Sequence, residues 1–319
     1  MTIGHHLRKL GGLPAVDFVR FEAGQPGLPE PGAVAWRIAV ESYDSEVKWE
    51  QAFARFTETV DTTLVRSLIV GSWSDPYEDG PQEVVAALLA ARDRLPALRA
   101  LFVGDIVVEE CEISWIVQDD VTPLLDGFPL LETFGVRGGN GLRFPAVRHG
   151  RLRSLTVETG GLPAAAVRGI AASDFPALEH LDLWLGTSEY GGDGDLADLA
   201  PFLAGTRLPA LRSLALRNSE LQDAIAAAFA AAPVVARLEN LDLSMGVLTD
   251  DGATALLGGQ PLTHLKTLDL HHNYLSKALK DRLREALEPA GVELDVDADD
   301  ADEEENEDGS VWRFVAVGE

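Results

Sequence analysis

One hydrophobic pattern returns at intervals along the chain and predicts its strands. It reads L-x-x-L/F-x-L/V in segments that begin at residues 98, 131, 152, 178, 211, 238 and 265, with a looser copy at 65–70 and a truncated one at 292–296. The fourth and sixth positions are two residues apart, so on a strand both point to the core while the fifth and seventh face outward. One such strand cannot bury its own face, so we expect the copies to stack into a parallel sheet.

The intervals between the copies indicate what connects the strands. The fourth positions are 21 to 33 residues apart, at residues 68, 101, 134, 155, 181, 214, 241, 268 and 294. Most intervals have room for a helix, and Asp195, Thr249 and Ser276 are predicted N-caps. Ser219 with Gln222 is a predicted capping box. Strands that alternate with helices in this way favour a curved solenoid, with the sheet on the concave face and the helices on the convex face.

Two stretches resemble ribonuclease-inhibitor-like leucine-rich repeats most closely: LENLDLSMGVLTDDGATALL at 238–257 and LKTLDLHHNYLS at 265–276. Asn273 falls at the turn asparagine of that family, whereas Gly246 and Ser219 stand there in two other copies. The resemblance implies an α/β leucine-rich-repeat solenoid with a parallel concave sheet, convex helices and about eight or nine repeats, capped at both ends.

The regions outside the regular pattern are expected to close the solenoid. We predict an N-terminal cap of strands plus a helix, the solenoid, an acidic disordered loop and a C-terminal capping strand, with the bounds 1–62, 63–296, 297–310 and 311–319. Within the first cap, residues 33–41 alternate like a half-buried strand, and residues 46–60 place aromatic side chains on one helical stripe. The apolar run at 311–317 is predicted to pair with residues 292–296 and protect the last sheet edge.

One interval breaks the regular stacking. The interval from residue 134 to residue 155 is too short for an ordinary helix and contains RGGNGLRFP. An irregular loop in a regular scaffold often carries function, although such a loop also sets curvature. The role of the segment 136–145 stays open on this reasoning.

Several stretches between the repeats are similar to one bacterial family of leucine-rich-repeat proteins. They are GDIVVEECEISWIVQDDVTPLL at 104–125, VRGGNGL at 136–142, LWLGTSEYGG at 183–192, LRNS at 216–219, LDLHHNYLS at 268–276 and the terminal RFVAVGE. That family is largely uncharacterised, and its members look like cytoplasmic accessory proteins encoded beside radical SAM and ATP-grasp enzymes. The resemblance implies a role in a peptide- or metabolite-modifying system.

Charge and composition narrow the range of partners. The net charge is −26, and the basic-free stretch from Glu293 to Asp308 holds eleven of the acids, which leaves −15 for the remainder. Such a field repels nucleic acid and anionic lipid, so we expect neither nucleic acid nor membrane as a partner, and it favours basic partners. No apolar run approaches the length of a membrane span. A single cysteine and no secretory signal favour a cytoplasmic location.

Candidate catalytic chemistry is weak. Cys111 has acids on both sides, which raise a thiol pKa and make it a poor nucleophile. His271 and His272 are adjacent on a predicted strand, so they point to opposite faces and do not share one ion. The GGDGD loop at 191–195 lacks the glutamate that a calcium loop needs. We therefore predict that the protein is not an enzyme and binds neither a cofactor nor a metal. The alternative is a metal-assisted hydrolase built on His271 with Asp269 and Asp242.

The outward positions of the strands provide the best candidate binding surface. An outward Trp184 among charged side chains is typical of an anchor at a protein interface. The predicted binding residues on this face are Glu158, Asp182, Trp184, Arg217, Asp242, Asp269 and His271. The sequence therefore predicts a non-catalytic scaffold whose concave face binds a basic protein or peptide, as an interaction module or as a chaperone of a substrate peptide.

Overall fold

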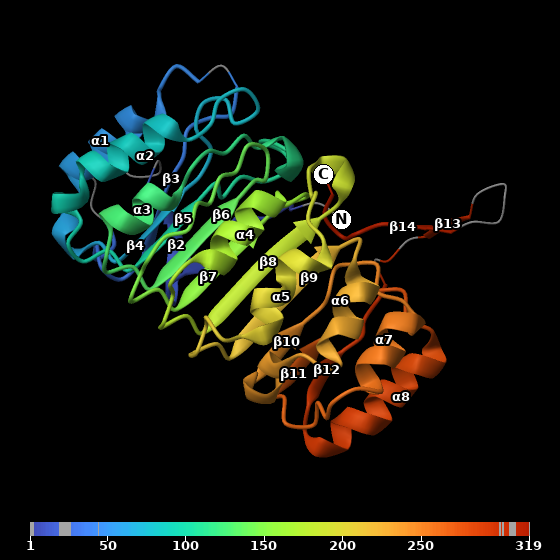
Figure 1. The fold of residues 1–319 in the computed structure, drawn as a ribbon. Helices are drawn as coiled ribbons and strands as arrows, with labels where there is room; N and C mark the ends of the chain where they lie inside the picture. The colour runs from blue at the N-terminus through green and yellow to red at the C-terminus, as the bar shows by residue number, and fades with distance from the viewer. Residues whose placement is uncertain are drawn as a thin grey trace.

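The computed structural model describes residues 3–18, 27–43, 45–299, 301, 303–305 and 311–318. Within them, a twelve-stranded sheet follows the chain order from β1 to β12 (Figure 1). Strands β1 and β2 pair antiparallel, and all later neighbours pair parallel. The strands are β1 Lys9–Leu10, β2 Leu13–Asp17, β3 Ala35–Ile38, β4 Ser67–Val70, β5 Ala100–Val103, β6 Thr133–Arg137, β7 Ser154–Glu158, β8 His180–Gly186, β9 Ser213–Ser219, β10 Asn240–Asp242, β11 Thr267–Asp269 and β12 Glu293–Asp295.

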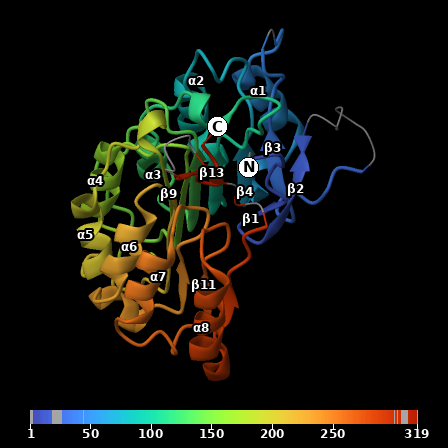
Figure 2. The same cartoon turned by 90° about the vertical axis from the view of Figure 1, so that its right-hand side faces the viewer.

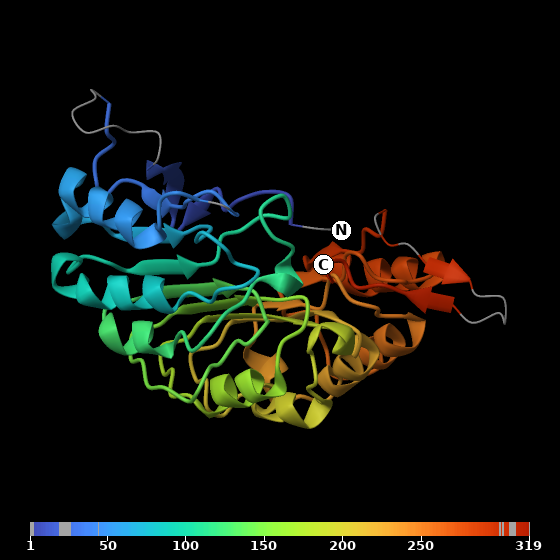
Figure 3. The same cartoon turned by 90° about the horizontal axis from the view of Figure 1, so that it is seen from above.

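Helices cover one face of this sheet. They are α1 Trp49–Thr59, α2 Gln82–Ala90, α3 Thr122–Gly127, α4 Ala164–Ala172, α5 Leu196–Ala204, α6 Gln222–Phe229, α7 Asp250–Leu257 and α8 Lys277–Leu287. Helices α4 to α8 lie side by side along the outside of the arc (Figure 2). Seen from above, the helices form the outer curve and both ends of the chain lie at its mouth (Figure 3). This arrangement confirms the predicted solenoid.

The predicted register of the repeats is confirmed. The nine predicted core positions pair in one unbroken row, from Leu68 opposite Leu101 to Leu268 opposite Leu294. The row also extends toward the N-terminus, where Trp36 lies opposite Leu68 and Val16 opposite Trp36. The sheet therefore holds more repeats than the predicted eight or nine, because tryptophan and valine occupy the leucine position in the first two.

Three of the four predicted helix starts are confirmed. The side chains of Asp195, Thr249 and Ser276 accept hydrogen bonds from backbone N–H groups in the first turns of α5, α7 and α8. The predicted capping box of Ser219 and Gln222 is wrong. Gln222 is fully buried and donates from Nε2 to the Leu216 carbonyl oxygen at 2.9 Å, and Leu221 is the N-cap residue of α6. The glutamine thus ties α6 to strand β9 instead of capping the helix.

The short interval between β6 and β7 contains no helix, as predicted. The chain crosses the core there as a loop that buries Leu142 and Phe144. The Phe144 carbonyl oxygen lies where a Cβ on Gly169 of α4 would stand, at 1.7 Å from it. Only glycine lets the loop approach the neighbouring helix so closely, so this loop packs as part of the core.

An N-terminal segment, residues 3–10, crosses the concave side of the sheet. Leu10 packs there on Ile69, Ala100 and Phe102, which point to the concave side from β4 and β5. Strand β3 is consequently buried on both faces. The prediction of a half-buried strand at 33–41 missed this second layer, because nothing in the strand itself indicates what covers its outer face.

The predicted pairing of the C-terminal strand is wrong. Strand β14, Val311–Arg313, pairs antiparallel with β13, Glu303–Glu305, and not with β12. Strand β13 falls inside the range predicted to be disordered, while residues 300, 302 and 306–310 lie outside the described residues. After β14, Phe314 is exposed, whereas Val315, Ala316 and Val317 are buried, and the last two pack in one cluster with Trp184.

Candidate functional site

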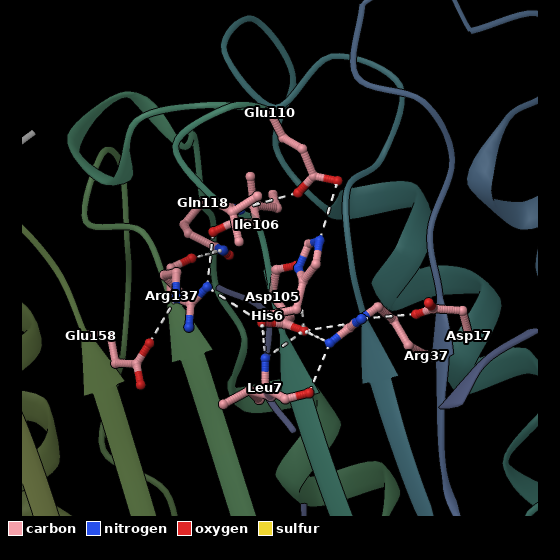
Figure 4. Close-up of polar contacts among 11 residues, drawn as sticks. His6, Leu7, Asp17, Arg37, Asp105, Ile106, Glu110, Gln118, Arg137 and Glu158 are labelled. Carbon is pink, nitrogen blue, oxygen red and sulfur yellow. Dashed lines mark hydrogen bonds and ion pairs between the residues drawn. The ribbon is translucent and has the colours of Figure 1, made fainter. Parts of the chain in front are cut away.

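A chain of buried ion pairs lies on the concave side beneath the N-terminal segment (Figure 4). At its centre, the Asp105 side chain is fully buried. It accepts hydrogen bonds from Arg37 Nε at 2.7 Å and Arg137 Nη1 at 3.3 Å, and from the backbone N–H of Leu7 at 3.0 Å. Burial alone would raise the pKa of Asp105, but the hydrogen bond with His6 and the two guanidinium groups hold it below its usual value.

The same chain reaches β2 and β7. Arg37 Nη1 contacts Asp17 at 2.8 Å, and Arg137 Nε contacts Glu158 at 2.7 Å. Arg37 also donates to the Leu7 carbonyl oxygen at 2.8 Å. The network therefore clamps the N-terminal segment onto the sheet. Glu158, one of the predicted binding residues, is only 8% exposed and offers little surface to a partner.

Trp184 points to the concave side, as its register predicts, but the protein itself covers it. Its neighbours in one apolar cluster are Ile3 of the N-terminal segment, Ile113, Met245, Ala316 and Val317, and its exposed fraction is 8%. The expectation of an open tryptophan anchor is therefore corrected. The two chain ends meet above the indole ring because its large apolar area is better buried than hydrated.

Arg217 lies over the same indole ring. Its guanidinium carbon is 5.0 Å from the ring centroid, and its Nη2 contacts Asp182 at 2.6 Å. Asp242 lies 3.3 Å from Nη1. Burial opposes charge on Arg217, yet these two carboxylates raise the pKa of the guanidinium above its usual value. Burial also raises the pKa of Asp182, against the effect of Arg217. Four predicted binding residues thus form one contacting group.

A C-terminal segment, residues 314–318, runs along the carboxyl ends of the strands. Asn218 at the end of β9 accepts from the Val317 N–H at 2.9 Å and donates to the Val317 carbonyl oxygen at 2.6 Å. The Ala316 N–H donates to the Met245 carbonyl oxygen at 2.8 Å, and Ser114 Oγ donates to the Gly318 carbonyl oxygen. The concave side is therefore closed along this edge by the chain's own backbone.

The part of the concave face that stays open is acidic. Asp242, Asp269 and Asp295 occupy the same position on β10, β11 and β12 and lie directly opposite one another in the sheet. The Asp242 and Asp269 side chains are 23% and 32% exposed, and Asp295 is exposed. Like charges that lie directly opposite repel each other. We call these three residues the aspartate ladder.

His271 stands beside this ladder. Its Nδ1 lies 2.7 Å from Asp269 Oδ1. Ligand atoms of Asp269, His271 and Asp295 lie within 4.8 Å of one another, the one grouping with metal-binding spacing found in the described ranges. Its residues are half to fully exposed, and exposed acids commonly gather in this way without an ion. The grouping therefore does not by itself favour the hydrolase alternative.

The imidazole of His271 is expected to titrate above its ordinary pKa of 6.5. The hydrogen bond to Asp269 is the largest cause, and it raises the pKa against the effect of burial. The stabilising pair is therefore complete below pH 6.5 and is lost as the pH rises through the higher folded-state pKa. Chemical shifts of the imidazole during a pH titration measure this, and Asp269→Asn should move the midpoint down. An unchanged midpoint would contradict the pairing.

Cys111 behaves as its sequence predicts. It is buried, and burial with the nearby Glu112 carboxylate raises the pKa of its thiol to about 11. A thiol that stays protonated near neutral pH is a weak nucleophile. Sequence reasoning missed Asp105, Arg37 and Asn218. Arg37 could have been found, because it is a charged residue at an outward strand position, like the residues predicted to bind a partner.

Comparison with known proteins finds similar solved structures. The crystal structure of a protein from Bacteroides fragilis superposes with a TM-score of 0.73 at 33% identity, over 79% of this chain and 70% of that one. An internalin from Listeria monocytogenes matches with a TM-score of 0.35 at 15% identity over 71% and 65% of the two chains, which is too weak to bear on the fold. No protein-family model and no curated protein matches. Among the described residues, no helix has the length and apolar character to cross a membrane. The chain belongs to the same family as the Bacteroides fragilis protein.

Proposed function

We propose that the protein is a non-catalytic scaffold that binds a basic segment of a partner protein or peptide on the open part of its concave face. The aspartate ladder is the observation that supports this most directly. Asp242, Asp269 and Asp295 stand on three neighbouring strands, all pointing to the same open side. Neighbouring strands are about 4.8 Å apart, so the ladder repeats a carboxylate at close spacing.

A basic segment fits this surface for an electrostatic reason. The three carboxylates repel one another, and a bound lysine or arginine side chain relieves that repulsion while it gains an ion pair. Arg217 is already held by Asp182 and Asp242 at the N-terminal end of the ladder, and His271 contacts Oδ1 of Asp269. The exposed Asp295 and the second oxygen of Asp269 are therefore left for a partner. His271 between them carries a positive charge only in its protonated form.

The setting proposed for this scaffold follows from the family resemblance. Accessory proteins encoded beside radical SAM and ATP-grasp enzymes would meet short peptides or modifying enzymes in the cytoplasm. A scaffold that binds an extended basic peptide would present it to such an enzyme. This accessory role is supported by the resemblance of the stretches between the repeats, and it rests on the binding surface described above.

A labelled basic peptide tests the proposal. The probe is a fluorescein-labelled twelve-residue peptide of alternating arginine and serine, and fluorescence anisotropy near physiological salt measures its affinity. The triple variant Asp242→Asn, Asp269→Asn and Asp295→Asn should bind about tenfold more weakly, because each exposed ion pair contributes up to about 1 kcal/mol.

A matched variant separates the ladder from the overall negative charge. Asp251→Asn, Glu285→Gln and Glu288→Gln remove the same charge from exposed positions on and beside α7 and α8. This control should keep the affinity within about twofold. Equal losses in the two triple variants would show that the probe responds only to net charge, and the proposed concave site would then be rejected.

A further inference from the structure

Three exposed aromatic side chains gather at the carboxyl edge of the sheet, away from the aspartate ladder. Tyr43, Tyr77 and Trp115 follow strands β3, β4 and β5, and their exposed fractions are 49%, 47% and 42%. These strands are parallel neighbours, so the loops that follow them emerge at the same edge. The rings of Tyr77 and Trp115 are in contact, with centroids 5.8 Å apart. We call these three residues the aromatic ledge.

Backbone hydrogen bonds hold the three loops together. The Tyr43 N–H donates to the Ser74 carbonyl oxygen at 2.8 Å, and the Val117 N–H donates to the Pro76 carbonyl oxygen at 2.7 Å. Burial, the neighbouring Cys111 and then the carboxylates of Asp75 and Glu112 raise the pKa of the Tyr43 phenol. The ledge is therefore one connected surface in which acids lie beside the aromatic rings.

The charged residues of the three loops themselves are all acidic. The stretches 41–47, 71–80 and 104–120 contain no lysine, arginine or histidine. Their exposed or half-exposed acids are Glu41, Glu46, Asp75, Glu78, Asp79, Glu109, Glu110, Glu112, Asp119 and Asp120. Of these, Glu110 lies near His6 and Asp119 is paired with Arg143. An arginine or lysine that lies over an aromatic face gains a cation–π interaction as well as ion pairs. The ledge therefore complements a cationic segment in both respects.

The backbone of Tyr43 adds a separate observation. The described chain has four non-glycine residues at positive φ, namely Tyr43 at 61°, Asn218, Met245 and His272. The last three each contact the backbone of the C-terminal segment. Tyr43 has the same unfavourable conformation, yet its ring is half exposed. Strain of this kind tends to persist at functional positions.

We propose that the aromatic ledge is a second binding surface, which takes an extended segment of a partner protein that carries arginine or lysine. Exposed aromatic anchors with complementary charge around them mark protein interfaces. The surface is formed by loops, whereas the aspartate ladder is formed by strands, so this inference goes beyond the function proposed above. A partner long enough to reach both would be bound at two points and more tightly than at either.

The test uses the arginine–serine peptide in a protein whose ladder is already neutral. In the background Asp242→Asn, Asp269→Asn and Asp295→Asn, measurable binding of the peptide should remain. Adding Tyr77→Ala and Trp115→Ala leaves the net charge unchanged and should weaken this remaining binding about tenfold. The matched control is Trp312→Ala in the same background, because Trp312 is 59% exposed on β14, outside the ledge. It should change the affinity by less than twofold.

Each outcome separates the two proposals. No remaining affinity in the ladder-neutral protein overturns the ledge and leaves the concave site standing, and equal effects of the ledge and Trp312 variants also overturn it. If the ladder variant does not weaken binding while the ledge variant does, the concave proposal fails alone.

Trp115→Lys guards against misfolding of the double variant and should weaken binding at least as strongly. Sedimentation should show one mass for all variants; a mass that falls on ledge mutation would mean a second copy is the occupant and would reject the peptide partner.

Discussion

Replacing Asp105 by alanine is expected to lower the free energy of unfolding by about 3–5 kcal/mol. The substitution leaves the guanidinium groups of Arg37 and Arg137 buried with one carboxylate fewer between them. It also removes the acceptor of the Leu7 N–H, so the N-terminal segment loses one of its attachments to the sheet. Urea unfolding followed by circular dichroism measures the change.

A surface ion pair provides the comparison. Arg153 and Glu179 lie 2.7 Å apart, and their side chains are 54% and 33% exposed. Glu179→Ala should therefore cost less than about 1 kcal/mol. If the two substitutions destabilise the protein equally, the Asp105 network contributes no more than a surface pair and the clamp described here is wrong.

The Asp105 contribution also depends on pH in a defined direction. The folded state lowers the pKa of Asp105 below the ordinary value of 3.8. A carboxyl group with a lowered pKa stabilises the fold above the unfolded-state value, and the benefit is lost as the pH falls through the folded-state value. The stability difference between the wild type and Asp105→Asn should thus be constant near neutral pH and shrink below about pH 4.

Replacing Asn218 by alanine is expected to release the C-terminal segment. The carboxamide makes both hydrogen bonds to the backbone of Val317. Without it, a buried N–H and a buried carbonyl lose their partners, at about 1–3 kcal/mol for each group that stays buried. Release of the segment would expose Trp184 and Met245 to water. We expect faster amide hydrogen exchange in residues 315–318 and a red shift of tryptophan fluorescence.

The control for Asn218 is another asparagine on the concave side. Asn240 on β10 is half-buried, and its side chain accepts one hydrogen bond from Thr267 Oγ1 at 3.0 Å. Asn240→Ala should destabilise the protein by less than about 1 kcal/mol and leave the exchange of residues 315–318 unchanged. Unchanged exchange in Asn218→Ala would mean that apolar packing alone holds the segment.

The periodic leucines predict the sheet because their constraint is local. A residue such as Leu181 must fill the space between Leu155 and Leu214 in its neighbouring strands, so spacing and residue type recur together. Strands β2 and β3 were not recognised as copies of the repeat, although residues 33–41 were predicted to form a strand, because Val16 and Trp36 fill the leucine layer with different shapes. Local helix caps such as Asp195 follow from short-range chemistry in the same way.

The sequence predicts on which face of the sheet the candidate site residues lie, but not which segments cover them. Register correctly places Trp184, Arg217 and Asp242 on the concave side. What covers them depends on contacts between distant residues, such as Val317 with Asn218 or Leu7 with Asp105, and no periodic pattern encodes these. The C-terminal pairing was wrong because β13, the actual partner of β14, lies in the acidic range predicted to be disordered, while Ala316 and Val317 pack against Trp184.

The bond between Ser114 and Gly318 joins residues 204 positions apart. A simple array of repeats touches only its nearest neighbours, so it can fray from either end one unit at a time. Here the last repeats cannot unfold by themselves until the C-terminal segment has lost its contacts with the central repeats. The solenoid should therefore melt in one sharp cooperative transition, with its terminal and central repeats losing protection together.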